Sequence, residues 1–149
     1  MKRIILLISL VVLLVGCSGA APQATKVSEA AVQPAAASLD NYVASDPAMI
    51  SSTGRPQVIE FFAFWCTTCQ AMRPVIHGLQ DRYRDKVDFI YLDIDAANTK
   101  DLQKTLGFTG LRPTLIFVTP EGTEMDRLVG VQASDQIAQK IDALMGGAG

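Results

Sequence analysis

Residues 57–69 read QVIEFFAFWCTTC, and this stretch decides the fold. Its apolar part, Gln57–Phe64, predicts a buried strand, and the following segment, Thr67–Arg84, predicts a helix. A Cys-x-x-Cys pair at such a junction places Cys66 on the first helical turn, where unpaired backbone N–H groups and the helix dipole stabilise a thiolate. Cys69 lies three residues on, on the same helix face, close enough to close a disulfide. The layout therefore predicts reversible dithiol–disulfide exchange.

The beginning of the chain resembles a bacterial export signal. Met1–Arg3 is basic, and the twelve residues of Ile4–Val15 are apolar apart from one serine. A helix that spans a bilayer needs about 20 apolar residues, so this run is too short for one. The run leads into Leu14–Cys17, which resembles the lipobox of bacterial lipoproteins, in which the cysteine becomes the lipidated first residue. We expect residues 1–16 to be a signal peptide and Cys17 to be lipidated. The alternatives are an ordinary signal peptide with a chance cysteine and an uncleaved anchor.

Composition divides the rest of the chain into a tether and a domain. Residues 18–38 are rich in Ala, Pro, Gln and Ser and contain no aromatic residue. This composition predicts that residues 17–38 are the lipidated cysteine and a flexible tether, with an Ala-rich helix as the alternative. Residues 39–149 are then one folded domain, long enough for a single core. The formal net charge of −2 and the lack of a basic patch argue against nucleic-acid binding.

The chain holds three cysteines. With Cys17 assigned to lipid, Cys66 and Cys69 remain to pair with each other, and a compartment outside the cytoplasm permits that bridge. A bridge across two intervening residues constrains little of the unfolded chain, so its expected role is chemical rather than structural.

The remaining patterns predict an α/β domain with a mixed four-stranded sheet flanked by helices. The order is βαβ, then a helix, then ββα, so the first two strands should be parallel and the last two antiparallel. In chain order, the expected elements are a short helix at 39–50, a strand at 57–64, a helix at 67–84, a strand at 87–93, a helix at 98–106, strands at 114–118 and 123–129, and a last helix that Ser134 caps.

Together, these features resemble the thioredoxin family over about residues 43–145. The resemblance rests on several separated motifs: the apolar strand into Trp65-Cys66-x-x-Cys69, Pro74 in the helix, Arg112-Pro113-Thr114, the Gly122 turn, and Gly130 after the last strand. It implies the thioredoxin fold and a thiol–disulfide oxidoreductase in which Cys66 attacks a substrate disulfide and Cys69 resolves the mixed disulfide. It implies no cofactor and no bound metal.

The resemblance also gives Glu60 a role. By strand alternation Glu60 shares a face with Val58 and Phe62 inside the apolar run, where burial should raise the pKa of its carboxyl. The matching thioredoxin position is a buried Asp that helps to move protons to and from the second sulfur, so Glu60 is expected to act on Cys69 in the same way. The alternative is a glutamate at a strand edge that reaches solvent.

A further set of residues is expected to meet the substrate. In thioredoxin-like proteins the proline that matches Pro113 follows a cis bond and lies beside the sulfurs, whereas the alternative is a trans proline that opens an edge strand. The resemblance implies a substrate-binding surface, which consists of Trp65, Arg112, Pro113 and Thr114.

The chain departs from thioredoxin at several positions. Thr67 and Thr68 replace Gly-Pro between the cysteines, and their hydroxyls could donate hydrogen bonds to the sulfur. Tyr91 stands where thioredoxin has a lysine near the buried acid, so that electrostatic partner is missing. Arg112 replaces an aliphatic residue and either acts beside the sulfurs, on the thiolate or on acidic substrates, or points to solvent. His77, the only histidine, is expected to pack or to lie at the surface.

The sequence therefore predicts an exported, lipid-anchored thiol–disulfide oxidoreductase, a reductase rather than an oxidase, that acts on protein disulfides and exchanges electrons with a membrane partner. It should be a monomer on the extracytoplasmic side of the cell membrane, or at the outer membrane if the cell has one. The alternative from another class is a Cu(I)-binding or chaperone-like module that uses the same two thiols. A redox-inactive interaction domain is disfavoured because both cysteines are present.

Overall fold

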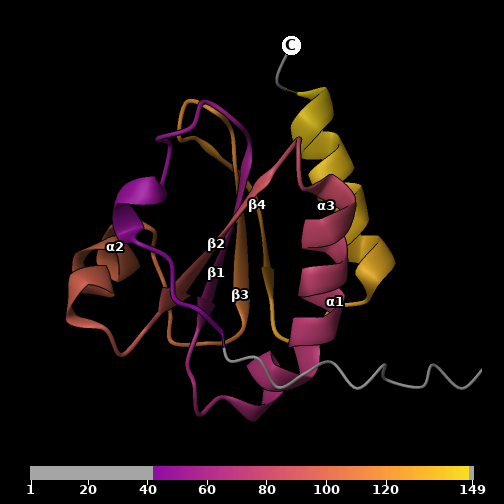
Figure 1. Ribbon diagram of the computed structural model, residues 1–149. Coiled ribbons are helices and arrows are strands. Elements are labelled where there is room, and N and C mark those ends of the chain that lie inside the picture. The colour runs from indigo at the N-terminus through magenta and orange to yellow at the C-terminus, as the bar shows by residue number, and fades with distance from the viewer. Residues whose placement is uncertain (1–41, 148–149) are drawn as a thin grey trace, which may run out of the picture. The chain divides into compact units, whose positions relative to one another are not determined.

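The computed structural model describes residues 42–147, so the expected signal peptide, Cys17 and the tether lie outside the described residues. Within this range, a mixed four-stranded sheet lies between helices, which confirms the predicted architecture (Figure 1). In chain order, with η for a 3-10 helix, the elements are η1 (Pro47–Met49), β1 (Gln57–Phe62), α1 (Thr67–Tyr83), β2 (Asp88–Asp93), η2 (Ala97–Thr99), α2 (Lys100–Thr105), β3 (Thr114–Val118), β4 (Glu124–Val129) and α3 (Ser134–Gly146).

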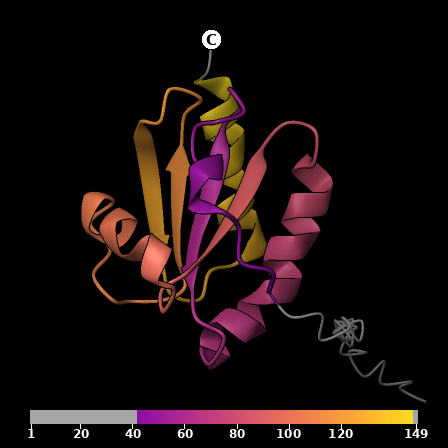
Figure 2. The ribbon, with the colours of Figure 1, turned by 60° about the vertical axis from the view of Figure 1, so that its left-hand side comes forward.

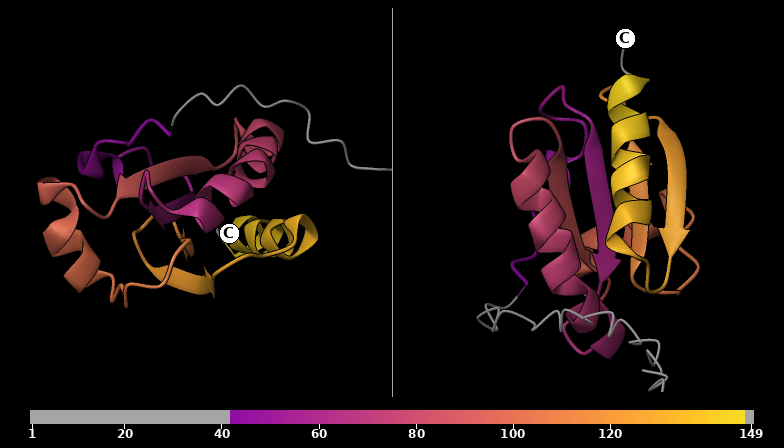
Figure 3. Two further views of the ribbon diagram at one scale, coloured as in Figure 1. Left: turned by 90° about the horizontal axis from the view of Figure 1, so that it is seen from below. Right: turned by 90° about the vertical axis from the view of Figure 1, so that its right-hand side faces the viewer.

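The sheet has the strand order β2-β1-β3-β4, with β1 at an interior position. β1 is parallel to β2 and antiparallel to β3, and β3 is antiparallel to β4, which confirms the predicted pairing. α1 and α3 lie side by side on one face of the sheet, and α2 lies on the other (Figure 3). All residues of β1 and β3 are buried, as expected for strands that helices cover on both faces.

Alternation along β1 sends successive side chains to opposite faces of the sheet. Phe61 packs against Phe108, which follows α2. Glu60 and Phe62 instead contact Tyr42 on the face that α1 covers. The Glu60 carboxyl therefore enters the core on the side of the two cysteines.

α1 has 17 residues and contains Pro74, as predicted. Its buried residues recur every three or four positions, which is the spacing of one helix face. Among residues 42–147, no helix is both long and apolar enough to cross a membrane. The buried face of α1 consists of Cys69, Met72, Ile76, Leu79 and Tyr83.

The predicted helix at 39–50 is wrong for the residues that the structure describes. Only Pro47–Met49 forms a 3-10 turn, and the residues before it are not helical. The segment instead runs beside β2, because the Ser45 N–H donates to the Tyr91 carbonyl at 2.7 Å and the Tyr91 N–H donates to Ser45 Oγ at 3.0 Å (Figure 2). These bonds, together with the burial of Tyr42, outweigh the weak local preference for a helix.

Several element boundaries also differ from the prediction, most of them by a single residue. Ala133, not Ser134, is the N-cap of α3, and the Gln136 side chain accepts the Ala133 N–H at 3.3 Å. A side-chain oxygen three residues into the helix thus satisfies this backbone group, as in a capping box, without a serine cap. β1 ends at Phe62, two residues before the predicted end.

Candidate active site

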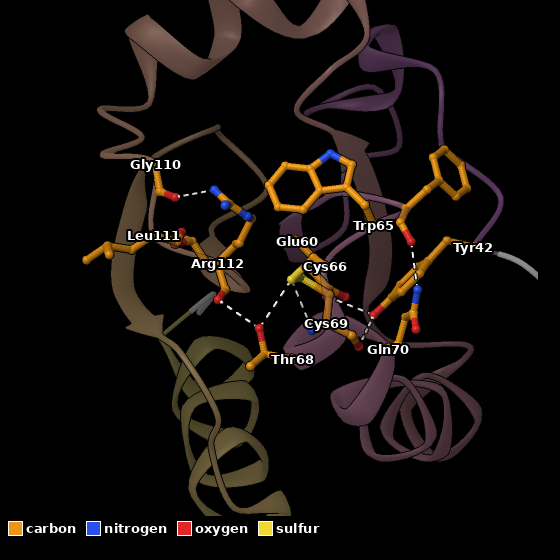
Figure 4. The surroundings of a disulfide bond; sticks show 12 residues. Tyr42, Glu60, Trp65, Cys66, Thr68, Cys69, Gln70, Gly110, Leu111 and Arg112 are labelled. Carbon is orange, nitrogen blue, oxygen red and sulfur yellow. Dashed lines mark hydrogen bonds between the residues drawn. A yellow bond between two sulfur atoms is a disulfide. The ribbon is translucent and has the colours of Figure 1, made fainter.

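Cys66 and Cys69 form a disulfide at the N-terminal end of α1 (Figure 4). Cys66 is the N-cap of the helix, and Cys69 lies on its buried face. Cys66 keeps 4% of its surface exposed, whereas Cys69 keeps none. Since a nucleophile must be reached from outside, Cys66 is the sulfur that a substrate can approach, and Cys69 can react only with its neighbour.

Two hydrogen-bond donors lie at the Cys66 sulfur. The Cys69 N–H donates to Cys66 Sγ at 3.1 Å, and Thr68 Oγ1 lies 3.2 Å from the same sulfur. The Thr68 hydroxyl also lies 3.4 Å from the carbonyl oxygen of Arg112, to which it can donate. A disulfide sulfur is a weak acceptor, so the hydroxyl is free to turn towards the sulfur once a thiolate forms.

Trp65 is an exposed aromatic side chain held from two sides. It keeps 57% of its surface exposed, and its Nε1–H donates to Asp95 Oδ2 at 2.6 Å. The Arg112 guanidinium carbon lies 4.2 Å from the centroid of the Trp65 ring, and Arg112 Nη1 donates to the Gly110 carbonyl at 2.6 Å. The guanidinium is thus engaged with Trp65 and the Gly110 carbonyl, rather than with a sulfur or with solvent alone.

The Arg112–Pro113 peptide bond is cis, as predicted. Pro113 and Thr114 are buried, and the Pro113 carbonyl accepts the Gly130 N–H at 2.8 Å. The Thr114 hydroxyl donates to the Leu111 carbonyl at 2.6 Å. The Thr114 side chain therefore stabilises the turn, and the Arg112 carbonyl lies within reach of the Thr68 hydroxyl, which also contacts the Cys66 sulfur.

Large apolar side chains are exposed in the segments that flank the disulfide. They belong to the connection between β1 and α1, to the loop before β3 and to the loop after β4. They are Phe64, Leu111 and Val131.

Glu60 is buried, with 1% of its surface exposed, as predicted. Its Oε1 accepts the Tyr42 hydroxyl at 3.0 Å, and among residues 42–147 its Oε2 has no hydrogen-bond partner. Burial raises the pKa of the Glu60 carboxyl to about 8, although the Tyr42 hydrogen bond and the positive charge of Arg73 act in the opposite direction. Near neutral pH the carboxyl therefore lies close to the point where it can either give or take a proton.

Tyr42 and Arg73 are site residues that the sequence analysis missed. The Tyr42 ring stacks on Phe62, with centroids 4.3 Å apart, and the Arg73 guanidinium carbon lies 4.3 Å from the Tyr42 centroid. Arg73 thus supplies a positive charge near the buried Glu60 carboxyl. The electrostatic partner that the sequence predicts to be absent, because Tyr91 replaces a lysine, is therefore provided by Arg73 instead. Its position four residues after Cys69 places it near that cysteine on α1, which is the sequence signal that could have identified it.

Tyr91 and His77 line the same part of the core without touching the sulfurs. The Tyr91 hydroxyl donates to Gln80 Oε1 at 2.8 Å. The His77 ring packs edge-on against Tyr42 and Tyr91, with centroids 6.1 Å and 5.8 Å away. Burial, and secondarily the charge of Arg73, lowers the pKa of His77. This packing role agrees with the expectation from the sequence.

The structured part of the chain contains no group of three or more His, Cys, Asp or Glu side chains that could hold a metal ion. A metal at this site would therefore have to be held by the two thiols of Cys66 and Cys69 in their reduced form.

Comparison with known proteins matches the thioredoxin family model to residues 37–143. Thioredoxin-like protein HCF164, chloroplastic, from Arabidopsis thaliana is 31% identical over 96 residues, which are 64% of this chain and 36% of HCF164. Thiol:disulfide interchange protein TxlA from Synechococcus elongatus is 36% identical over 93 residues, which are 61% of this chain and 47% of TxlA. The chain thus spans less than half the length of these two relatives.

Solved structures give the same result. The crystal structure of thioredoxin NaTrxh from Nicotiana alata aligns with a TM-score of 0.54 and 31% sequence identity, over 63% of this chain and 76% of NaTrxh. Mitochondrial thioredoxin 3 from Saccharomyces cerevisiae, in its oxidized form, aligns with a TM-score of 0.55 and 26% identity, over 63% and 83% of the two chains.

The raised pKa of Glu60 predicts a specific pH dependence of stability. Between the ordinary glutamate pKa of 4.5 and about 8, the native oxidised protein holds a proton that the unfolded chain has lost, so its stability falls as pH rises. We expect the free energy of unfolding of the wild type to fall relative to that of Glu60→Gln across this window, by up to ~1.4 kcal/mol per pH unit, and then to level off. Urea unfolding of both oxidised proteins from pH 5 to 9 measures this.

Asp101→Asn removes a carboxylate from the exposed surface of α2 and serves as the control. If the free energy of unfolding changed with pH by the same amount in the wild type and in Glu60→Gln from pH 5 to 9, the raised pKa of the buried carboxyl would be contradicted.

Proposed function

Since this chain belongs to the thioredoxin family, we propose that it is a thiol–disulfide oxidoreductase that exchanges disulfides with protein substrates outside the cytoplasm. The observation that carries the proposal is the Cys66–Cys69 disulfide at the N-terminus of α1, with one reachable sulfur and one buried sulfur. This asymmetry matches a two-step exchange, in which one thiol meets the substrate and the other releases it.

The steps follow from the positions of the sulfurs. In the reduced protein the Cys66 thiolate attacks a substrate disulfide, and one substrate sulfur leaves as a thiolate. Cys69 then gives its proton to the Glu60 carboxylate and attacks Cys66 Sγ, so that the second substrate sulfur leaves. The substrate disulfide gains two electrons and is released as two thiolates, which take protons from solvent, while Cys66 and Cys69 are oxidised to their disulfide and Glu60 keeps the proton from Cys69. The Thr68 hydroxyl and the Cys69 N–H support the Cys66 thiolate.

The substrate chain is proposed to dock across the exposed surface beside Cys66. Trp65, Phe64 and Leu111 offer apolar contact there, and the chain around Pro113 forms the adjoining wall. Because the Arg112 guanidinium is stacked on Trp65, it extends this surface as a flat cation rather than as a mobile charge.

Substitution of each cysteine tests the mechanism. We expect Cys66→Ser to abolish reduction of a protein disulfide such as insulin, because no other thiol among the described residues is accessible. We expect Cys69→Ser to stop after one step and to accumulate a mixed disulfide with the substrate, which nonreducing electrophoresis and mass spectrometry detect. Thr67→Ser, a conservative change on the exposed first turn of α1, is the matched control.

Full turnover by Cys66→Ser would rule out the proposed chemistry. An inactive wild type whose reduced form binds Cu(I) tightly would favour the metal-binding module instead.

The environment of Cys66 favours a reductase over an oxidase. Strongly oxidising members of such exchange systems owe their potential to a highly stabilised thiolate. Within residues 42–147, the groups at the Cys66 sulfur are a backbone N–H and a neutral hydroxyl, and the nearby guanidinium of Arg112 is engaged with Trp65. With only neutral donors the thiolate is stabilised modestly, so the disulfide should be hard to reduce.

The redox potential of the Cys66–Cys69 pair therefore decides whether the protein reduces or oxidises its substrates. We expect a value near or below about −250 mV from equilibration in defined thiol–disulfide buffers. Such a protein would need a membrane electron donor to work in an oxidising compartment. A value above about −180 mV would contradict the reductase assignment and indicate an oxidase or isomerase.

The proposed location rests on the N-terminal sequence. A basic start, a short apolar run and Leu14–Cys17 in lipobox form support export, cleavage after residue 16 and a lipid on Cys17, with residues 18–38 as a tether. One acyl chain binds a membrane only weakly, so stable anchoring requires more than one chain on the modified cysteine.

Lipidation makes Cys17→Ser a direct test of location. We expect the wild type, expressed in a bacterium that processes lipoproteins, to incorporate an alkyne-labelled fatty acid and to sediment with membranes. Cys17→Ser should lose the label and the sedimentation, whereas Cys66→Ser should keep both. Label on Cys17→Ser, or a wild type that is released in soluble form, would contradict the lipoprotein proposal.

A further inference from the structure

One buried hydroxyl connects the carboxyl of β1 with the second cysteine on α1. The Tyr42 hydroxyl lies 3.0 Å from Glu60 Oε1 and 2.9 Å from the carbonyl oxygen of Cys69 (Figure 4). Tyr42 belongs to neither element, because it lies in the segment that precedes η1. No other hydrogen bond between described residues reaches the Glu60 carboxyl.

We propose that Tyr42 is a positioning residue for proton transfer at Cys69, acting by holding the Glu60 carboxyl against the first turns of α1. The inference rests on the exchange chemistry proposed above. The hydroxyl occupies Oε1, which leaves Oε2 as the oxygen that takes the proton from the Cys69 thiol and returns it in the reverse direction.

The Tyr42 hydroxyl has one proton to donate, and two acceptors lie within reach, Glu60 Oε1 and the Cys69 carbonyl oxygen. The acceptor that it uses should therefore depend on whether Glu60 is ionised. When Glu60 is ionised, Tyr42 donates to the carboxylate, because a charge-assisted bond is the stronger one. When Glu60 is neutral, with its proton on Oε2, Oε1 is a weaker acceptor, and Tyr42 can donate to the Cys69 carbonyl instead. Burial, and secondarily the Glu60 charge, raises the pKa of Tyr42, so the hydroxyl keeps its proton throughout.

Other titratable groups lie around Glu60, and none of them is joined to it by a hydrogen bond between described residues. Arg73 and His77 approach from α1, and Tyr91 is the register partner of Glu60 on β2. On β3 the register partner is Leu115, which carries no charge. Arg73 favours the ionised carboxyl, whereas burial opposes it, and Tyr42 is the group that adds a directional bond.

Packing and hydrogen bonding by Tyr42 can be separated experimentally. The ring is held by stacking on Phe62 at 4.3 Å and by Arg73 on its face, and neither contact needs the hydroxyl. Tyr42→Phe therefore keeps the packing and removes only the bond to Glu60 and Cys69. Tyr91→Phe is the matched control, since it removes a nearby hydroxyl that bonds Gln80 instead.

The direct test is the titration of the Glu60 carboxyl in the full-length oxidised protein, followed by NMR of carboxyl-13C glutamate. We expect a midpoint near 8 in the wild type and in Tyr91→Phe. In Tyr42→Phe the carboxylate loses a hydrogen bond, and the midpoint should rise by about one pH unit. An unchanged or lower midpoint in Tyr42→Phe would overturn the proposal.

Turnover gives the second readout. The pH profile of disulfide exchange should move upward in Tyr42→Phe, while in a Glu60→Gln background Tyr42→Phe should have no further effect on the profile. Equal loss of rate at every pH in both backgrounds would mean a purely structural role and would also overturn the proposal. If the wild type itself exchanges no disulfide, the proposed function fails, but the titration still decides whether Tyr42 holds Glu60.

A measurement without Tyr42→Phe covers the case in which that variant does not fold. In Tyr83→Phe/Tyr91→Phe, Tyr42 is the only one of the three tyrosines left. Infrared spectra with ring-13C tyrosine should then show the Tyr42 C–O stretch shifting as Glu60 titrates. A band that stays constant across that transition would overturn the proposal.

Discussion

The short connection between β1 and α1 is the constraint on which the site depends. β1 ends at Phe62 and α1 begins at Thr67, so few residues carry the chain from an interior strand to a helix on one face of the sheet. This places Cys66 at the helix N-terminus, beside the carboxyl end of β1. Glu60, two residues before the end of the strand, then lies in the core on the same face as Cys69. One backbone turn thus sets the positions of both the sulfurs and the acid.

Burial of Glu60 sets the chemistry that this geometry allows. Removing a carboxylate from water is costly, and the protein avoids most of that cost because the raised pKa, about 8, leaves the group largely neutral near pH 7. The hydrogen bond from Tyr42 and the positive charge of Arg73 stabilise the ionised carboxylate and so limit the rise of the Glu60 pKa. A group whose pKa lies near the working pH serves equally as acid and base, which suits a proton transfer that must run in both directions.

Local patterns in the sequence were enough to predict the strands, α1, α3 and the cysteine pair, because each depends on the spacing of neighbouring residues. The cis bond before Pro113 came from the family resemblance alone, since few X–Pro bonds are cis. Tyr42 could not be found in this way, because its place is set by contacts with Glu60 and Phe62 and by the pairing of Ser45 with Tyr91, far along the chain. The predicted helix there failed for the same reason.

The pairing of Arg112 with Trp65 bears on how the proposed substrate is recognised. The Trp65 ring is held between a guanidinium on its face and the Asp95 carboxylate at its N–H, so it is already ordered before any partner arrives. Ordering a side chain in advance removes part of the entropy that binding would otherwise cost. Asp95 also places a negative charge on the same surface as Arg112, which weakens any preference for acidic substrates. Recognition at Cys66 should therefore depend on apolar contact with a rigid ring rather than on charge.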